Sequence, residues 1–310
     1  MSLSFNSLIL YMKFKGVQFQ HVNEYDAMEI LEYKNYYFKL NSYIDNYPLE
    51  KNNHQNQIVE RYQYVDFKNL VDLASLDMQL RYIIIKMCLD IEHSLKLSII
   101  RKVTRIDNED GYKIVESFFN HIQKVGNIEK PYNKLLKYLK FDTYRKLDFE
   151  KYKKNTPIWF LIEHIQFGDL CWFIEFFCKQ YGIKEFKKIN STIRYVKNIR
   201  NKAAHNTPVL NNIVLTDQLV GSKKSAIITH YGKHLGISNK VLNKRLKNYN
   251  INDLLAMFFV YDSVVMSESM KKHRKSELKD FMWRAKRNKS IYDERFSAVY
   301  NFFNKVIENF

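Results

Sequence analysis

The sequence is poor in residues that interrupt helices or cross-link chains. It has 8 glycines, 4 prolines and 3 cysteines among 310 residues. With so few helix breakers, a mainly helical fold is expected. Cys88, Cys171 and Cys178 form no C-x-x-C pair and lie in apolar stretches, where we expect buried small hydrophobes and a reducing compartment. A chain of this length can bury a core without a metal or disulfide.

No apolar stretch approaches the length of a membrane span, and the N-terminal apolar run is too short for a signal peptide. We therefore expect a cytoplasmic protein. The chain has no P-loop, no dinucleotide-binding glycine pattern and no serine nucleophile elbow. His230 and His234 have the spacing of metal ligands on a helix, but Gly232 lies between them and no third ligand is near. We expect no metal and no cofactor.

Basic residues outnumber acidic ones, with 50 Lys and Arg against 33 Asp and Glu and a formal net charge of +17. Such an excess attracts a polyanion such as RNA, although a lysine-rich surface in an AT-rich genome explains it equally well. Between residues 271 and 290, basic residues surround aromatic ones, which fits either a groove for single-stranded RNA or an exposed connection between helices. The candidate RNA-binding residues are Lys202, Lys244, Arg245, Lys272, Arg274, Arg284 and Arg287.

Apolar residues at helical spacing predict long helices over residues 65–103, 183–205, 251–270 and 292–310. The polar face of the first, which carries Asp77 and Arg81, is expected to be solvated or to pair with another subunit. Residues 47–63 are polar and predict a loop, and residues 104–156 predict short helices. We expect an N-terminal helical segment (1–62), a core (63–270) and a basic C-terminal helical segment (271–310), or one domain containing all three.

Two shorter segments allow more than one structural or functional interpretation. The aromatic residues between 33 and 43 fall mostly at helical intervals, which favours core packing over stacking on bases; they are Tyr33, Tyr36, Tyr37, Phe38 and Tyr43. Thr156 and Pro157 are expected as N-cap and first residue of a buried helix, in which Gly168 marks a break or a close crossing. Glu163 and His164 predict a buried hydrogen-bonded pair, with a catalytic pair as the alternative.

Arg200 and His205 lie near the end of the helix predicted over 183–205. Thr207 precedes Pro208 and disfavours helical dihedrals, so the helix should stop at or just after the pair. The spacing alone is common by chance. Two residues five apart on a helix differ by about 140° in direction and about 7.5 Å in rise. A long Arg side chain, a loosened helix or a second subunit is needed to bring both groups to one cleft.

Four stretches, in order, resemble motifs of the bacterial abortive-infection Abi-like family of the AbiD and AbiF type, whose core belongs to the HEPN superfamily. FKGVQF and NYYFKLNSY (35–43) are similar to the K-G and N-Y-Y-R-L-x-x-Y patterns, and LDMQLRYIIIKMCLDIEHSLKLSI (76–99) to D-x-x-L-R followed by I-E-x-S-L-R. TPIWFLIEHIQFGDL (156–170) is similar to P-x-W-x-x-x-E-x-x-x-x-G, and IRNKAAHN (199–206) to I-R-N-x-x-A-H. Phe38 stands where the family usually has Arg, and the chain beyond about 270 does not align.

The resemblance implies a HEPN-type helical bundle with additional helices and basic loops. It also implies a metal-independent endoribonuclease that acts as a toxin in phage defence and is restrained by a bound RNA. Because the chain has one Arg-His signature, we expect a composite site at a homodimer interface or a monomer that is held inactive. His205 can donate or accept a proton near neutral pH, and Arg200 can bind phosphate oxygens. Asn201 and Asn206 are expected to support them. The alternatives are a non-catalytic RNA-binding protein with a cognate noncoding RNA, or a helical scaffold for other proteins.

Overall fold

The computed structural model describes residues 4–54, 57–216 and 225–310. It is 73% helical, which confirms the mainly helical prediction. Among the helical elements, one turn of π-helix is labelled η1 (Ile30–Lys34), and the short 3-10 helices are η2 (Ile44–Asn46), η3 (Lys137–Phe141) and η4 (Lys289–Ile291). In chain order the elements are α1 (Phe5–Phe14), α2 (Glu24–Glu29), η1 (Ile30–Lys34), α3 (Tyr37–Asn41), η2 (Ile44–Asn46), β1 (Leu49–His54), β2 (Gln57–Tyr62), α4 (Phe67–Val103), α5 (Lys113–Gly126), α6 (Pro131–Leu136), η3 (Lys137–Phe141), α7 (Lys146–Tyr152), α8 (Ile158–His164), α9 (Phe167–Tyr181), α10 (Lys184–Ala204), α11 (Ala226–His234), α12 (Asn239–Arg245), α13 (Tyr249–Val264), α14 (Glu268–Lys286), η4 (Lys289–Ile291) and α15 (Glu294–Asn309).

The chain forms two compact units. Unit 1 comprises residues 1–87, 198–255 and 267–310, and unit 2 comprises residues 88–197 and 256–266. The helices α4, α10 and α13 each contribute residues to both. The expected division into segments 1–62, 63–270 and 271–310 stays a prediction. No helix among the described residues is long and apolar enough to cross a membrane.

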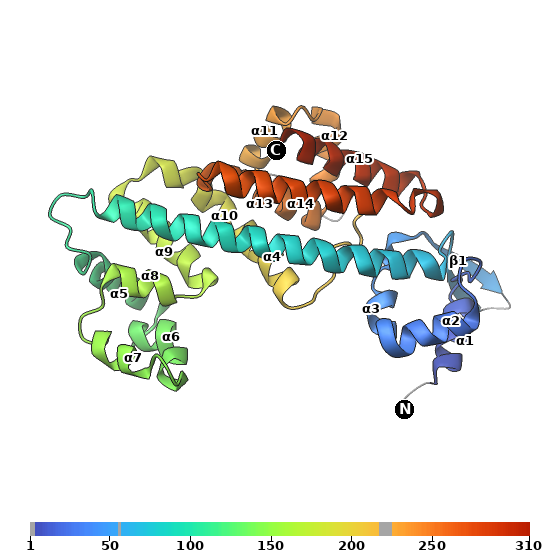
Figure 1. Ribbon diagram of the computed structural model, residues 1–310, viewed down its shortest axis with the longest axis horizontal. Helices are drawn as coiled ribbons and strands as arrows, with labels where there is room; N and C mark the ends of the chain where they lie inside the picture. Colours follow the sequence, from blue (N-terminus) through green and yellow to red (C-terminus); the bar gives the residue numbers. More distant parts are fainter. Residues whose placement is uncertain (1–3, 55–56, 217–224) are drawn as a thin grey trace. The chain divides into compact units, whose positions relative to one another are not determined.

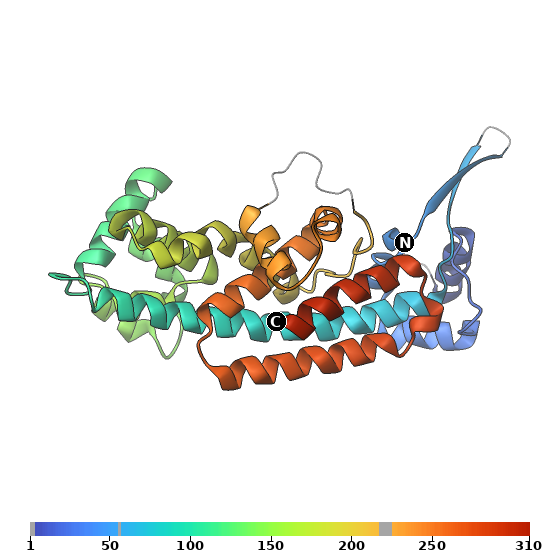
Figure 2. The ribbon, with the colours of Figure 1, turned by 90° about the horizontal axis from the view of Figure 1, so that it is seen from above.

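In unit 1, α14 and α15 lie alongside the first half of α4, as Figures 1 and 2 show. The buried Asp72 of α4 accepts hydrogen bonds from Arg284 Nη2 at 2.7 Å, Asn288 Nδ2 at 2.7 Å and Tyr292 Oη at 2.8 Å. One carboxylate therefore ties the end of α14 and the residues before α15 to α4. The segment 271–290, expected either as a groove for single-stranded RNA or as an exposed connection between helices, is mostly the helix α14.

The N-terminal elements of unit 1 surround a hydrophobic cluster that includes Met12, Leu31, Leu40 and Phe67. After α1, Gly16 adopts φ +95°, and a Cβ there would overlap the carbonyl oxygen of Tyr62. Only glycine fits this turn without strain.

Residues 47–63 contain a β-hairpin, so the loop prediction was wrong there. β1 and β2 pair antiparallel, from Leu49 opposite Tyr62 to His54 opposite Gln57. The pairing extends by one further backbone hydrogen bond, from Gln63 N to Pro48 O at 2.9 Å. The segment is polar and lacks the apolar alternation that predicts strands, so backbone pairing is not visible in the sequence.

In unit 2, the core is rich in aromatic rings. Phe118 of α5 lies 5.0 Å from Phe173 and 5.4 Å from Phe176 of α9, and Phe177 lies 5.8 Å from Phe186 of α10, measured between ring centroids. Edge-on and tilted contacts of this kind add to the stabilisation from burial. α5 to α7 are the short helices predicted for residues 104–156.

The buried stretch after residue 156 differs from its prediction in two details and agrees with it in a third. Pro157, with φ −77° and ψ 153°, is the N-cap of α8, and the hydroxyl of Thr156 donates to Tyr152 O instead of capping. The predicted break between two helices is confirmed, because α8 ends at His164 and α9 begins at Phe167, with Gly168 in its first turn. Glu163 is exposed and His164 Nδ1 lies 2.9 Å from Phe160 O, so the predicted buried pair of Glu163 and His164 was wrong.

Candidate functional site

Helix α10 carries Arg200 and ends just before His205. Asn206 has φ +58°, the left-handed conformation that asparagine tolerates better than most residues. The N–H of Thr207 donates to Lys202 O at 2.9 Å, the six-to-one bond of a Schellman motif. His205 is thus the C-cap of α10, which confirms that the helix ends at the pair.

The Arg200 and His205 side chains are both accessible. Arg200 is half-buried, and its Nη1 donates to Asn201 Oδ1 at 3.4 Å, while His205 is exposed. Within the described residues no hydrogen bond joins the two side chains. Arg200 therefore retains donors that can bind a phosphate, and the His205 imidazole can reach a ligand from the helix end.

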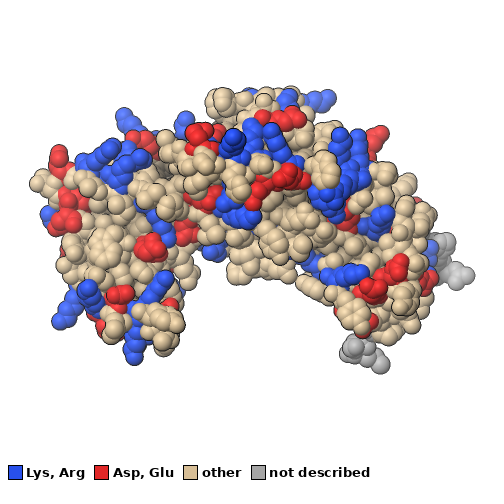
Figure 3. All heavy atoms as spheres, viewed as in Figure 1, with Lys and Arg blue, Asp and Glu red and all other residues tan. Residues whose placement is uncertain are grey.

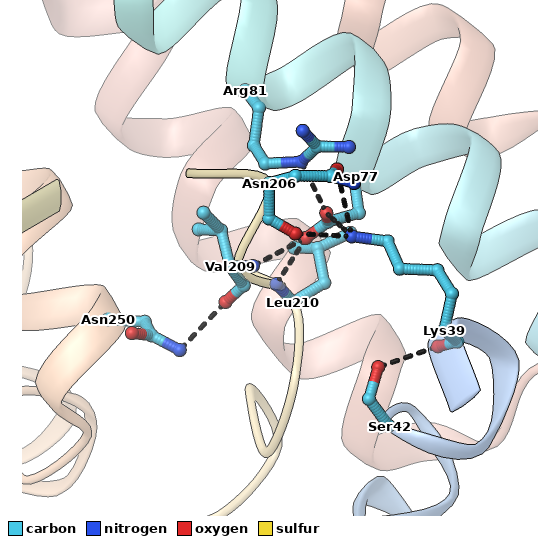
Figure 4. Close-up of polar contacts among 8 residues, drawn as sticks. All are labelled: Lys39, Ser42, Asp77, Arg81, Asn206, Val209, Leu210 and Asn250. Carbon is cyan, nitrogen blue, oxygen red and sulfur yellow. Dashed lines mark hydrogen bonds and ion pairs between the residues drawn. The ribbon is translucent and has the colours of Figure 1, made fainter. Parts of the chain in front are cut away.

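Behind this helix end lies a buried carboxylate, Asp77 of α4, whose side chain is fully buried (Figure 4). Its Oδ1 accepts hydrogen bonds from Val209 N at 2.6 Å and Leu210 N at 2.8 Å. Its Oδ2 accepts one from Arg81 Nε at 2.8 Å. The solvated face expected for Asp77 and Arg81 was wrong, because both are buried in this contact.

Lys39 of α3 joins the same cluster (Figure 4). Its Nζ donates to Asn206 O at 3.0 Å, and lies 3.4 Å from Asn206 Oδ1 and 3.6 Å from Asp77 Oδ2. Burial lowers the pKa of the Lys39 ammonium group, and the Asp77 carboxylate partly offsets this effect. The cluster therefore fixes the backbone immediately after His205.

The position of Lys39 corrects the comparison of motifs. When R-L-x-x-Y is aligned on Leu40 and Tyr43, the basic residue falls on Lys39 and not on Phe38. Phe38 is 78% exposed, whereas Lys39 is 6% exposed and bonded inside the protein. Three of the four motif stretches thus supply one cluster, through Lys39, Asp77 with Arg81, and Asn206. A basic residue directly before the apolar Leu40 is the signal that could have revealed this.

The loop after the cluster is held by three buried asparagines. Asn46 Nδ2 donates to Leu210 O at 2.9 Å, and Asn250 Nδ2 to Val209 O at 2.8 Å. Asn248 Nδ2 donates to the carbonyl of the next loop segment, at residue 212, at 2.7 Å. Sequence reasoning missed these residues. Their bonds satisfy loop carbonyls that burial would otherwise leave unpaired.

The predicted RNA-binding residues, all in unit 1, fall into two groups. The exposed ones are Lys244, Lys272 and Arg287. The others bond within the protein or are buried: Arg274 pairs with Glu277 at 2.7 Å, Arg284 with Asp72 at 2.7 Å, Lys202 donates to Asn250 Oδ1, and Arg245 is buried. Burial lowers the pKa values of Lys202 and Arg245. RNA binding by any of these residues stays a prediction.

The aromatic residues of 33–43 are mostly outside the core. Tyr33, Tyr36 and Phe38 are 74%, 55% and 78% exposed, so core packing was wrong for these three. The π-turn η1 and the five-residue α3 break the helical register on which that prediction rested. Tyr43 is buried as expected, and burial raises the pKa of its hydroxyl.

Within the described residues, no group of three or more His, Cys, Asp or Glu side chains could hold a metal ion.

The comparison with known families agrees with this geometry. The sequence profile of the family described as Abi-like protein matches residues 29–211, more than half of the chain. The matched range begins before Lys39 and ends after Leu210, so it includes every residue of the cluster around Asp77. No curated protein and no solved structure matches the chain. The chain belongs to the Abi-like protein family.

Proposed function

We propose that this protein is a metal-independent endoribonuclease of the HEPN type, acting in the cytoplasm as an abortive-infection toxin against phage. The observation that carries the proposal is the accessible Arg200 and His205 at the end of α10, next to a backbone turn fixed by Lys39 and Asp77. Family membership supports a role in abortive infection.

The chemistry needs two groups that this helix end supplies. His205 would take the proton of a ribose 2′-hydroxyl or give one to the leaving 5′-oxygen, since imidazole can do either near neutral pH. Arg200 would bind the non-bridging oxygens, where negative charge builds up as the 2′-oxygen attacks phosphorus. The P–O5′ bond breaks, leaving a 2′,3′-cyclic phosphate and a 5′-hydroxyl end. Asn201, bonded to Arg200, would orient the guanidinium.

A homodimer would complete the site. The chain has a single Arg-His signature, and the two side chains are not bonded to each other within the described residues. An isologous interface can bring two copies of one surface together. We propose that two copies of the motif form composite sites at the interface, each with the arginine of one protomer and the histidine of its partner, and that a bound RNA restrains them until infection.

Cleavage of labelled RNA in EDTA tests the enzymatic proposal. The wild-type protein should release products with cyclic-phosphate ends. His205→Ala should lower the cleavage rate by about 100-fold or more, the usual contribution of general acid–base catalysis, and should abolish growth arrest on induction. The matched control is His234→Ala, which removes another exposed histidine of unit 1.

The alternative is an RNA-binding protein that does not cut. The same experiment separates the two, because a binder gives a salt-sensitive gel shift without products. The net charge of +17 favours RNA binding in either case. Equal cleavage by wild type and His205→Ala would remove the catalytic assignment.

A further inference from the structure

One face of α14 presents a row of basic side chains and a tryptophan. At 100° per residue, Lys272, Lys279, Trp283 and Lys286 fall within a sector of about 60°. All four are exposed, Trp283 by 62%. We call these four residues, with Arg287 next to them, the α14 stripe. It is about 21 Å long from Lys272 to Lys286, at 1.5 Å per residue.

The buried side of α14 fixes which face points outward. Leu278 and Met282 are buried, and Arg284 bonds to Asp72 of α4. Arg274 pairs with Glu277, which also accepts a hydrogen bond from Lys86 of α4 at 2.5 Å. The helix cannot rotate without breaking these contacts, so the stripe is a fixed feature of unit 1.

The cations of the stripe are not held in ion pairs. In the part of the chain that the structure describes, Lys272, Lys279, Lys286 and Arg287 form no ion pair. Two acidic residues lie near them: Asp280 follows Lys279 at the edge of the stripe, and the exposed Glu268 precedes Lys272 by one helical turn. Figure 3 shows Lys and Arg side chains over this part of unit 1, with Asp and Glu side chains among them. Four cations held on one helical face attract a polyanion more than the same charges dispersed would.

Trp283 adds a feature that charge alone does not. The Arg287 guanidinium lies over its ring at 4.0 Å from the centroid, a cation–π contact that orders the indole while leaving much of it exposed. Aromatic faces beside a row of cations are typical of proteins that bind single-stranded nucleic acid, where a base stacks on the ring and phosphates meet the cations.

We propose that the α14 stripe binds single-stranded RNA, with Trp283 stacking on a base and Lys272, Lys279 and Lys286 contacting phosphates. The inference rests on the proposed function in taking RNA as the ligand. It does not depend on cleavage, because binding can be measured with a protein that cannot cut.

Binding of a fluorescent 20-nucleotide single-stranded RNA to the His205→Ala protein tests the stripe. The triple variant Lys272→Glu, Lys279→Glu, Lys286→Glu should raise Kd about tenfold or more. It should also flatten the dependence of log K on log salt by about 2, as expected for three lost phosphate contacts. Trp283→Ala should raise Kd about fivefold or more, and Trp283→Phe should restore most of the affinity.

The matched control is the triple variant Lys137→Glu, Lys140→Glu, Lys146→Glu, which changes the net charge equally at exposed positions of unit 2. It should raise Kd much less. Equal loss in both triples, or a folded Trp283→Ala protein that binds RNA normally, would overturn the stripe. The proposal would also fail if the triple variant of the stripe lost binding to anionic vesicles but still bound RNA like the parent protein. If His205→Ala still cuts RNA, the proposed catalytic role fails while the binding comparison, repeated with an uncleavable 2′-O-methyl RNA, stands.

Discussion

At the scale of single residues, Lys39 connects the first motif of the chain to the last. Its ammonium group lies between the Asp77 carboxylate and the Asn206 carbonyl, 167 residues away in sequence. Burying a charge is costly unless it is paired and hydrogen-bonded, as it is here. Without it, Asp77 would keep Arg81 as a partner, but the Asn206 carbonyl would lose its donor.

Lys39→Met tests whether this contact positions His205. We expect RNA cleavage under single-turnover conditions to slow about tenfold or more, since small misplacements of catalytic groups are costly. The Kd for RNA should stay within about twofold, and the free energy of unfolding in urea should fall by about 1–3 kcal/mol. Lys39→Arg should restore the cleavage rate, because it returns a cationic donor.

The control for this variant is Lys34→Met, which removes an exposed lysine from the same segment. It should change neither rate nor stability. A Lys39→Met protein that unfolds more easily yet cleaves at the wild-type rate would show a purely structural contact.

Arg200 and His205 are predictable from the sequence because their spacing and their motif are both local. The role of Asp77 is not, because its partners Val209 and Leu210 are more than 130 residues away and bond through backbone atoms that carry no sequence signal. Its charge on an otherwise amphipathic helix looked like a solvated face, and only the packed loop shows that it is buried.

At the scale of elements, the end of α10 depends on one left-handed residue. Asn206→Gly should leave the free energy of unfolding within about 0.5 kcal/mol of wild type, because glycine adopts φ +58° without strain. Asn206→Ala should destabilise the protein by about 1 kcal/mol and slow cleavage, since alanine lacks the short polar side chain that lets asparagine adopt this conformation. Urea unfolding and single-turnover cleavage measure the two effects.

Asn127, at the C-cap of α5 in unit 2, has φ +51° and provides the comparison. Asn127→Ala should cost a similar free energy and leave cleavage unchanged. If both alanine variants slowed cleavage equally, lost stability would account for the effect of Asn206→Ala.

Elements were predictable where one apolar stripe persisted over many turns. α4, predicted over 65–103, runs from Phe67 to Val103, and α10, predicted over 183–205, from Lys184 to Ala204. The sequence does not predict α14 as a continuous helix, because its buried side is narrow, with Leu278 and Met282 buried among many charged residues. Its inward contacts are largely polar, which a search for apolar periodicity does not detect.

At the scale of the whole molecule, the question is how many chains make one active site. One chain supplies one Arg200 and one His205, five residues apart across the end of a helix. If a site takes its arginine from one protomer and its histidine from the other, then cleavage should depend on protein concentration near the dissociation constant of the dimer. Activity and sedimentation should change over the same concentration range.

Mixed dimers of Arg200→Ala and His205→Ala chains decide the arrangement. Each variant alone should be inactive. In a mixed dimer, the intact arginine of one chain and the intact histidine of the other can form one complete composite site, while the second site lacks both groups. Coexpressed chains, isolated through two different tags, should therefore recover about half the activity of the wild-type dimer. No recovery in a verified mixed dimer would place both groups of each site on the same chain and remove the composite arrangement.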